Sequence, residues 1–464
     1  MSRFNQKDQL AFATLSGDFN PAHLDPNYAR RLIWGGASVH GIHQVFFGIN
    51  YWLKSKNKKY IFQKFNAKFL KPLLVTSKFN IEVTELEKSV EIRLISSNIV
   101  TTRINFSYKT VSHLYNENFP NRTFVESLPS QLGIENIDSL ERFEEVCFDQ
   151  TLLLKLFPNI FYHFCHIQIG VALSTTRIVG MKCPGLNSIF SELALGFTGQ
   201  PNRDILSVLY KVDRIHKIFK RIDFKFSFPQ MTGKIKTFLR PIPYSQPTIE
   251  SLSDLIKEKQ LHGEKVLVIG GSRGIGEVTL KLLALGGAEV FFTYNKGKID
   301  ADRIVGELKQ HDLQVSYFKY DVLKKGQQIK DTFTHLYYFA TPFIFTGQKD
   351  KFQFESFSTF SEFYLKGFFD IVQQLCDKGL EKVFYPSTIA ISDCVNGMWE
   401  YSAAKAAGEQ LCKSLEKRYK HLTIHRPRLP RILTDQTVSV MTSQGEQSEL
   451  EMIKYLKAMH GALN

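Results

Sequence analysis

Residues 265–294, KVLVIGGSRGIGEVTLKLLALGGAEVFFTY, contain four consecutive signals of one fold. An apolar run of strand length is followed by a glycine-rich turn, an amphipathic helical pattern and a second run of β-branched and aromatic residues. Gly270, Gly274 and Gly276 let the backbone turn tightly and let a pyrophosphate approach the amino end of the helix. This order of strand, turn and helix predicts a dinucleotide-binding domain.

The same alternation of strand and helix patterns continues towards the end of the chain. Such alternation predicts an α/β Rossmann domain, with a doubly wound parallel sheet covered by helices on both faces. We place this domain at 263–464. Its predicted strands lie at 265–270, 289–294, 314–320, 334–340, 382–386 and 422–425.

A proline-rich segment at 241–249, PIPYSQPTI, separates this domain from the first half of the chain. Its three prolines in seven residues exclude a regular helix or a central strand. Before it, a helical pattern followed by strand-like runs occurs twice. This predicts two copies of an α+β unit in which a sheet wraps a helix, at 1–115 and 116–245. The predicted elements are a helix at 39–54, strands at 66–84 and 89–108, helical patterns over 149–198, and strands at 204–212 and 222–228.

The composition fits two or three folded domains. The chain has 464 residues, of which 43% are hydrophobic and 22% charged, which excludes disordered and collagen-like classes. Its net charge of +14 favours anionic partners. The basic residues are scattered, without an arginine-rich arm or zinc-finger spacing, so we do not expect nucleic-acid binding.

The cysteines and the apolar segments indicate a cytoplasmic protein without a membrane span. No C-x-x-C pair and no secretory leader occur, so we expect reduced thiols. The most apolar segment, 159–181, contains two histidines and an arginine, which favours a buried helix over a membrane span. The cysteines are Cys147, Cys165, Cys183, Cys376, Cys394 and Cys412.

The stretch 12–29, FATLSGDFNPAHLDPNYA, carries the first chemical constellation. Asn20 and Pro21 favour a turn, which would bring the side chains of Asp18 and His23 together. A carboxylate and an imidazole holding one water form an acid/base pair, in which one group moves a proton on carbon and the other serves the hydroxyl. We expect Asn20 to orient that water.

A second feature of this region lies at 36–42, GASVHGI, where the apolar helix begins. The backbone N–H of Gly41 is therefore predicted at a helix amino terminus. An N–H group in that position is suited to stabilising a thioester oxyanion.

These residues resemble the signature of the MaoC-like, R-specific (type 2) enoyl-CoA hydratases. The resemblance implies a hot-dog fold in which Asp18 and His23 add water to, or remove it from, the C2–C3 bond of an acyl thioester. It also implies a double hot dog whose second, degenerate half shapes the acyl tunnel. Ala22 departs from the signature, which has a larger aliphatic residue there. The matching residues are Phe12, Ser16, Gly17, Asp18, Asn20, Pro21, His23, Ala29, His40 and Gly41.

The second constellation begins with the cofactor loop. NAD enzymes usually carry an acidic residue at the tip of the second strand, where it binds the ribose hydroxyls. Here the tip is Tyr294 and Asn295, followed by Lys296, and Arg273 lies inside the glycine loop. Because this region carries cationic side chains and no acidic one, it favours a ribose 2′-phosphate. We therefore predict NADPH over NADH.

Two segments further along supply catalytic candidates. In 401–405, YSAAK, Tyr401 and Lys405 lie one helical turn apart, so the ammonium is expected to lower the phenol pKa. In 384–388, FYPST, a hydroxyl is expected to hold the substrate oxygen. We favour Ser387 for that hydroxyl and keep Thr388 as the alternative.

Over 263–440 the chain resembles the short-chain dehydrogenase/reductase superfamily. The glycine string matches except that Ile269 replaces Thr, and Tyr364 stands where the Asn of the family's proton relay is usual. The segment 338–342, YFATP, replaces the usual N-N-A-G. The implied cofactor contacts are Gly270, Ser272, Arg273, Gly274, Ile275, Gly276, Tyr294, Asn295, Asp321, Val322, Ala340, Tyr401 and Lys405, without a metal.

Together the two resemblances imply a bifunctional enzyme acting on an acyl-CoA or an acyl carrier protein thioester. The reductase would interconvert 3-oxo and (R)-3-hydroxy forms, and the dehydratase would interconvert the hydroxy and enoyl forms. Two alternatives stay open: a reductase with an unrelated substrate such as a sugar nucleotide, and one half acting as a binding scaffold. Both families commonly form oligomers, so a homo-oligomer is implied.

Overall fold

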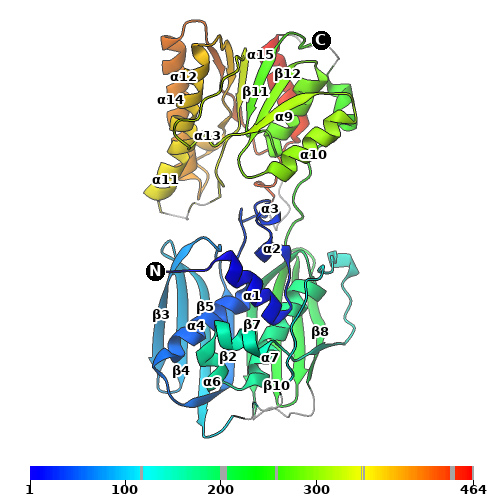
Figure 1. Ribbon diagram of the computed structural model, residues 1–464, viewed down its shortest axis with the longest axis vertical. Coiled ribbons are helices and arrows are strands. Elements are labelled where there is room, and N and C mark those ends of the chain that lie inside the picture. The colour runs from blue at the N-terminus through cyan, green and yellow to red at the C-terminus, as the bar shows by residue number, and fades with distance from the viewer. Residues whose placement is uncertain are drawn as a thin grey trace. The chain divides into compact units, whose positions relative to one another are not determined.

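Figure 1 shows the computed structural model, which describes residues 1–114, 116, 119–198, 206–256, 260–345, 347, 351–438 and 445–461. The chain forms two compact units, and the boundary between them falls between Ile242 and Pro243. This boundary lies inside the proline-rich segment predicted as a linker. The two units are described separately.

The first unit is built on one antiparallel sheet, which has ten strands among the described residues, in the order β1-β3-β4-β5-β2-β7-β10-β9-β8-β6. The pairing of β2 with β7 joins the two predicted halves, because Lys64–Lys68 pairs with Glu192–Gly196. The strands are β1 (Ser2–Arg3), β2 (Lys59–Phe69), β3 (Lys78–Leu86), β4 (Ser89–Ser96), β5 (Ile99–Val111), β6 (Arg142–Glu145), β7 (Ser188–Phe197), β8 (Ser207–His216), β9 (Arg221–Phe228) and β10 (Met231–Leu239).

Two helices, α4 (Gly41–Trp52) and α7 (His166–Arg177), lie against this sheet (Figure 1). Gly48 lets α4 approach closely, since a Cβ there would lie 3.1 Å from both Ile92 and Ile104. The side chain of Gln168 on α7 exchanges two hydrogen bonds with the backbone of Phe62, where β2 shifts its register against β5. The other helical segments are α1 (Gln6–Ser16), α2 (Pro21–Leu24), α3 (Pro26–Ala29), η1 (Leu53–Ser55), η2 (Ile134–Asn136), α5 (Gln150–Leu156), α6 (Pro158–His163) and the π-helical turn η3 (Ile178–Lys182).

The sequence predicted several of these elements and was wrong about others. The strand-like runs expected at 66–84 and 89–108 each contain parts of two strands, β2 with β3 and β4 with β5. The helix expected at 39–54 is α4, and α7 is buried along its whole length, as predicted for the apolar segment. The helical pattern expected to 198 ends at η3, and the residues after it form β7, between β2 and β10. Hydrogen bonding to two neighbouring strands outweighs the helix propensity of its leucine and alanine residues. Strands β1, β6 and β10 were not predicted.

The second unit contains a parallel sheet of six strands among the described residues, in the order β13-β12-β11-β14-β15-β17. This order, in which β11 lies centrally and the chain winds outwards in both directions, is that of a doubly wound dinucleotide-binding sheet. All six strands were predicted. They are β11 (Lys265–Ile269), β12 (Glu289–Tyr294), β13 (Val315–Lys319), β14 (His335–Tyr338), β15 (Lys382–Phe384) and β17 (Thr423–His425), and a separate pair joins β16 (Ser387–Thr388) to β18 (Arg428–Leu429).

Helices cover both faces of this sheet, as predicted. Val266 and Val268 belong to one core cluster, with apolar residues of α9, α10 and α15, whereas Leu267 and Ile269 belong to another, with residues of α12 and α14. The helical segments are α8 (Ile249–Leu252), η4 (Ser253–Leu255), α9 (Gly274–Leu285), α10 (Lys298–Lys309), α11 (Phe354–Ser361), the π-helical turn η5 (Glu362–Gly367), α12 (Phe368–Cys376), α13 (Ala390–Asp393), α14 (Trp399–Arg418) and α15 (Ser448–His460).

All six cysteines are free thiols, and five of them are buried while Cys394 is exposed. In the part of the chain that the structure describes, none of the helices combines the length and the apolar character needed to cross a membrane.

We predict that Gly233→Val destabilises the first unit by about 1–3 kcal/mol, because it overpacks the core. A Cβ at this position of β10 would lie 2.0 Å from Cζ of Phe226, whose ring is buried on the neighbouring strand. Urea unfolding of the full chain measures the effect. Gly306→Ala in α10 is the control, because a Cβ there meets no atom within 4 Å. An unchanged urea midpoint for Gly233→Val would contradict this packing.

Candidate active sites

The first site is built on the loop between α1 and α2. Gly17 ends α1 in a left-handed conformation with φ +78°, and Asn20 caps α2 by accepting a hydrogen bond from the Ala22 N–H at 3.0 Å. A Cβ at Gly17 would lie 2.8 Å from the Arg177 side chain, so glycine is needed for space as well as for conformation. Asp18 precedes the cap residue Asn20 in the sequence, and His23 follows it.

The predicted pair comes together in the structure. A carboxylate oxygen of Asp18 and ring nitrogens of His23 and His40 lie within 4.8 Å of one another. Nδ1 of His23 lies 2.8 Å from the Ser38 carbonyl, which only accepts hydrogen bonds. Nδ1 therefore carries the proton, and Nε2 has a lone pair. Burial raises the pKa of Asp18 and lowers the pKa of His23.

His40 packs against this pair, and Gly41 follows it in the sequence. The buried His40 ring stacks on His23 with centroids 3.9 Å apart, and its Nε2 lies 3.0 Å from the Asp18 carbonyl. Burial lowers the pKa of His40 well below its usual value. Gly41 is the first residue of α4, where backbone N–H groups have no partner within the helix. Its predicted position at the helix start is confirmed.

Asn20 lies in the site but is bound to the chain itself. Its amide nitrogen donates to the carbonyls of Gly180, Gly185 and Leu186 at 3.0, 3.2 and 3.2 Å. Its oxygen accepts the cap hydrogen bond of α2. The amide hydrogens are therefore committed to backbone oxygens, and Asn20 positions the loop instead of orienting a water as the sequence suggested.

The second half of the unit supplies residues that sequence reasoning missed. Thr176 of α7 donates a 2.6 Å hydrogen bond to Oδ2 of Asp18, and Gly180 leaves room for that carboxylate, since a Cβ there would lie 2.3 Å from Oδ1. Arg177 forms a buried ion pair with Glu144 and donates to the Ser16 carbonyl at 2.7 Å. No motif in the segment around Thr176 marks these roles, which only the tertiary structure reveals.

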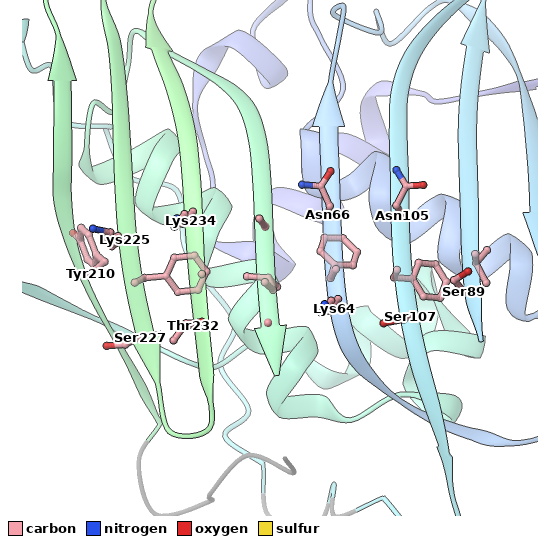
Figure 2. Close-up of a pocket in the computed structure, with 18 of the residues that line it drawn as sticks. Lys64, Asn66, Ser89, Asn105, Ser107, Tyr210, Lys225, Ser227, Thr232 and Lys234 are labelled. Carbon is pink, nitrogen blue, oxygen red and sulfur yellow. The ribbon is translucent and has the colours of Figure 1, made fainter. Parts of the chain in front are cut away.

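A cavity of about 1120 Å³ lies along the sheet of this unit (Figure 2). Strands of both halves line it, and Asp18, His23 and Gly41 are not among the lining residues. The cavity is therefore a feature of the sheet and not of the catalytic loop. The labelled residues are Lys64, Asn66, Ser89, Asn105, Ser107, Tyr210, Lys225, Ser227, Thr232 and Lys234.

The second site begins with the turn between β11 and α9. Gly270 and Gly274 have φ of +79° and +59°, and a Cβ at Gly276 would lie 2.4 Å from the Gly270 carbonyl oxygen. This close backbone approach leaves the amino end of α9 open to a phosphate group, which fits a dinucleotide. The other predicted cofactor residues lie in the turn, at the start of α9, or at the carboxyl ends of the neighbouring parallel strands. They are Ser272, Arg273, Ile275, Tyr294, Asn295, Asp321, Val322 and Ala340.

Tyr401 and Lys405 lie one turn apart on α14, as predicted, but burial dominates their titration. Burial raises the pKa of Tyr401 to about 12, against a hydrogen bond with Thr388 that lowers it. Burial lowers the pKa of Lys405 to about 7. The expected lowering of the phenol pKa by the ammonium is thus absent from this arrangement. Tyr401 keeps its proton at neutral pH, which suits a proton donor.

The structure places Thr388, and not the favoured Ser387, in contact with Tyr401. The Ser387 hydroxyl donates to Glu409, which is itself held by Arg428 in two hydrogen bonds of 2.8 and 2.9 Å. Thr388 is the residue bonded to Tyr401. Thr388, which precedes Tyr401 by thirteen residues, therefore stays the candidate that the geometry favours.

Tyr364, at the position of the usual relay Asn, lies buried in the π-helical turn η5. Its hydroxyl lies 2.6 Å from Oγ1 of Thr341, and its ring centroid lies 4.0 Å from Nζ of Lys405. Lys405 also donates to the Pro386 carbonyl at 2.6 Å. The aromatic face of Tyr364 and the Pro386 carbonyl thus hold the lysine.

Comparison with known proteins identifies the first of these regions. Residues 2–104 match the family model for the MaoC like domain. The (R)-specific enoyl-CoA hydratase of Aeromonas caviae is 34% identical over 104 residues, which cover 21% of this chain and 76% of that protein. The chain belongs to the MaoC-like family.

A later region of the chain matches a second family model. Residues 264–338 match the family model for short chain dehydrogenase. The Arabidopsis thaliana glucose and ribitol dehydrogenase homolog 2 is 41% identical over 73 residues, or 14% of this chain, which spans about a quarter (25%) of that protein. The predicted fusion, with the MaoC-like domain first, is confirmed.

Solved structures of short-chain dehydrogenases are also similar to the chain. One from Burkholderia cenocepacia, in complex with NADP, is 18% identical and covers 44% of this chain and 93% of its own, with a TM-score of 0.38. One from Serratia marcescens is 18% identical and covers 42% and 91%, with a TM-score of 0.37.

We predict that Glu144→Gln destabilises the MaoC-like unit by about 3–5 kcal/mol, because it leaves the Arg177 guanidinium buried without its charge partner. The side chains of Glu144 and Arg177 are only 8% and 5% exposed. Glu145→Gln is the matched control, since its pair with Arg122 is exposed and is worth about 0–1 kcal/mol. Urea unfolding of the full chain measures the free energy of unfolding of both variants. Equal losses of stability would contradict a stabilising role of the buried ion pair.

Proposed function

We propose that the chain is a bifunctional acyl-thioester enzyme, with a hydratase/dehydratase in the MaoC-like domain and an NADPH-dependent 3-oxoacyl reductase in the second domain. The observation that carries the proposal is the occurrence in one chain of a buried Asp18 beside a partly buried His23 and of a partly buried Tyr401 bonded to Thr388. The two chemistries meet at one intermediate, the (R)-3-hydroxyacyl thioester. The proposal includes the prediction that the first unit consists of two hot-dog halves.

In the hydratase, a water molecule lies between Asp18 and His23. The lone pair on Nε2 of His23 accepts a proton from this water as its oxygen bonds to C3, and the carboxyl of Asp18 delivers a proton to C2. The raised pKa of Asp18 and the lowered pKa of His23 match these roles. The Gly41 N–H stabilises the oxyanion that develops on the thioester. Dehydration reverses each step.

In the reductase, Tyr401 donates its phenol proton to the substrate oxygen, which Thr388 holds. The nicotinamide, when bound, supplies the hydride. Gly270, Gly274 and Gly276 would hold its pyrophosphate. Arg273, together with a β12 tip that lacks an acid, favours the 2′-phosphate of NADPH.

The remaining parts of the proposal concern partners and setting. The excess of Lys and Arg, 59 against 45 Asp and Glu, suits the phosphates of CoA or an acidic carrier protein. A cytoplasmic location and a homo-oligomeric state complete the proposal.

We expect two separable activities. Crotonyl-CoA should lose its enoyl absorbance, and acetoacetyl-CoA should oxidise NADPH faster than NADH. Asp18→Asn should lower hydration by about 10²–10⁴-fold and leave reduction unchanged, and Tyr401→Phe should do the converse. If neither thioester reacts with the wild-type chain, the proposal is wrong.

The two hydroxyls before Tyr401 give a second prediction. Thr388→Val should lower reduction of acetoacetyl-CoA by at least about 10²-fold, because it removes the hydroxyl that holds the substrate oxygen. Ser387→Ala should lower it by less than about fivefold, since Ser387 contacts Glu409 and not Tyr401. Steady-state kcat/KM for both variants distinguishes the roles, and a greater loss in Ser387→Ala would restore the sequence-based choice.

The match to a glucose and ribitol dehydrogenase homologue favours one alternative, in which the reductase acts on a sugar, a polyol or a sugar nucleotide. Glucose, ribitol and a nucleoside diphosphate sugar, each offered with NADP or NADPH, test it. Turnover of one of these without turnover of acetoacetyl-CoA would select this alternative. If neither class is reduced while hydration persists, the second domain is a binding scaffold.

A further inference from the structure

A second group of titratable residues lies in the Rossmann domain. It is found at the amino ends of the parallel strands, whereas the cofactor turn follows the carboxyl end of β11. Glu264 precedes β11, His335 begins β14 and His460 ends α15. One ligand atom of each lies within 4.8 Å of the others. The two histidine rings stack with centroids 4.7 Å apart. Neither proposed reaction uses these residues.

Hydrogen bonding fixes the tautomer of His335. The hydroxyl of Thr334 donates its only hydrogen to the Lys265 carbonyl at 3.1 Å, and Nδ1 of His335 lies 2.9 Å from the same hydroxyl oxygen. That oxygen must therefore accept from an Nδ1–H group. The lone pair of His335 is consequently on Nε2.

Nε2 of His335 lies near a carboxylate oxygen of Glu264. Its distance to Oε2 of Glu264 is 3.8 Å. Nε2 of His335 is buried without a hydrogen-bond partner, and the His335 side chain is only 5% exposed, whereas Oε2 of Glu264 lies 2.6 Å from Nδ1 of His460. A buried acceptor without a partner is unfavourable, and a cation bound to Nε2 of His335 would supply one.

His460 supplies a third nitrogen with a supporting partner. Its Nδ1 lies 2.8 and 2.6 Å from the two carboxylate oxygens of Glu264, and its Nε2 lies 2.7 Å from the hydroxyl of Tyr337. Because a carboxylate only accepts hydrogen bonds, Nδ1 donates its proton to Glu264 in the absence of a cation. A bound cation would replace that proton, and Nε2–H would then donate to the Tyr337 oxygen. Such a hydrogen bond on the outer nitrogen commonly orients a metal-binding histidine.

We propose that Glu264, His335 and His460 bind a divalent transition-metal cation, for which zinc is the best fit. Two imidazole nitrogens and one carboxylate oxygen are a usual zinc donor set, with water as the fourth ligand. Zinc bonds of about 2.1 Å place tetrahedral ligands about 3.4 Å apart. The gap of 3.8 Å between Glu264 and His335 is close to that value. The contacts of 2.6 and 2.8 Å between His460 and Glu264 are hydrogen-bond distances, so zinc binding would displace the Nδ1 proton and move these two side chains apart.

The site would fasten the last helix to the sheet. Met452, Leu456 and Met459 of α15 are buried in the same core cluster as α9. His460 is the last residue of that helix, so a metal at this point ties its end to the starts of β11 and β14. The cation therefore has a structural role, separate from both proposed reactions.

The test uses the untagged full chain, stripped with a chelator and dialysed against micromolar zinc. Mass spectrometry of the metal content and the thermal unfolding midpoint are the readouts. We expect one zinc per chain and a higher midpoint with zinc. Glu264→Gln and His335→Asn should each weaken zinc affinity at least tenfold and abolish the shift. His335→Asn keeps a donor near Nδ1 but removes the Nε2 ligand.

His421→Asn is the control, because His421 is an exposed histidine of the same domain. This variant should bind zinc as the wild type does. Equal midpoints of wild type, Glu264→Gln and His335→Asn in chelator would show that the variants fold. The proposal is overturned if the chain retains no zinc, or if both ligand variants retain it with wild-type affinity.

Discussion

The pairing of β2 with β7 is the contact on which the first unit depends. It turns two sets of strands into one sheet, and it brings the end of α7 against the loop that carries Asp18. Thr176, Arg177 and the carbonyls bound by Asn20 all come from the second half. A half without a catalytic motif is therefore required to hold the motif of the other half in place.

Both sites use burial to set the charge of their acid and base groups. In the MaoC-like domain, burial raises the pKa of Asp18 and lowers the pKa of His23. In the second domain, burial raises the pKa of Tyr401 and lowers the pKa of Lys405. In each of these four side chains, burial therefore favours the uncharged form.

The sequence was most informative where structure follows from local pattern. The glycines of the cofactor turn and the six parallel strands could be predicted, because strand runs and turn residues recur at short spacing. It was least informative where distant segments decide. The strand β7 has a helical composition, Thr176 carries no motif, and the choice between Ser387 and Thr388 depends on Glu409, 22 residues away.

The hydrogen bond between Asp18 and Thr176 joins residues 158 positions apart. A growing chain therefore releases its catalytic motif from the ribosome long before the partners of that motif exist. Until Thr176 and the carbonyls after it emerge, the aspartate has no buried environment to alter its acidity. The buried surroundings of Asp18 are thus completed late in synthesis, when the second half of the unit closes the sheet.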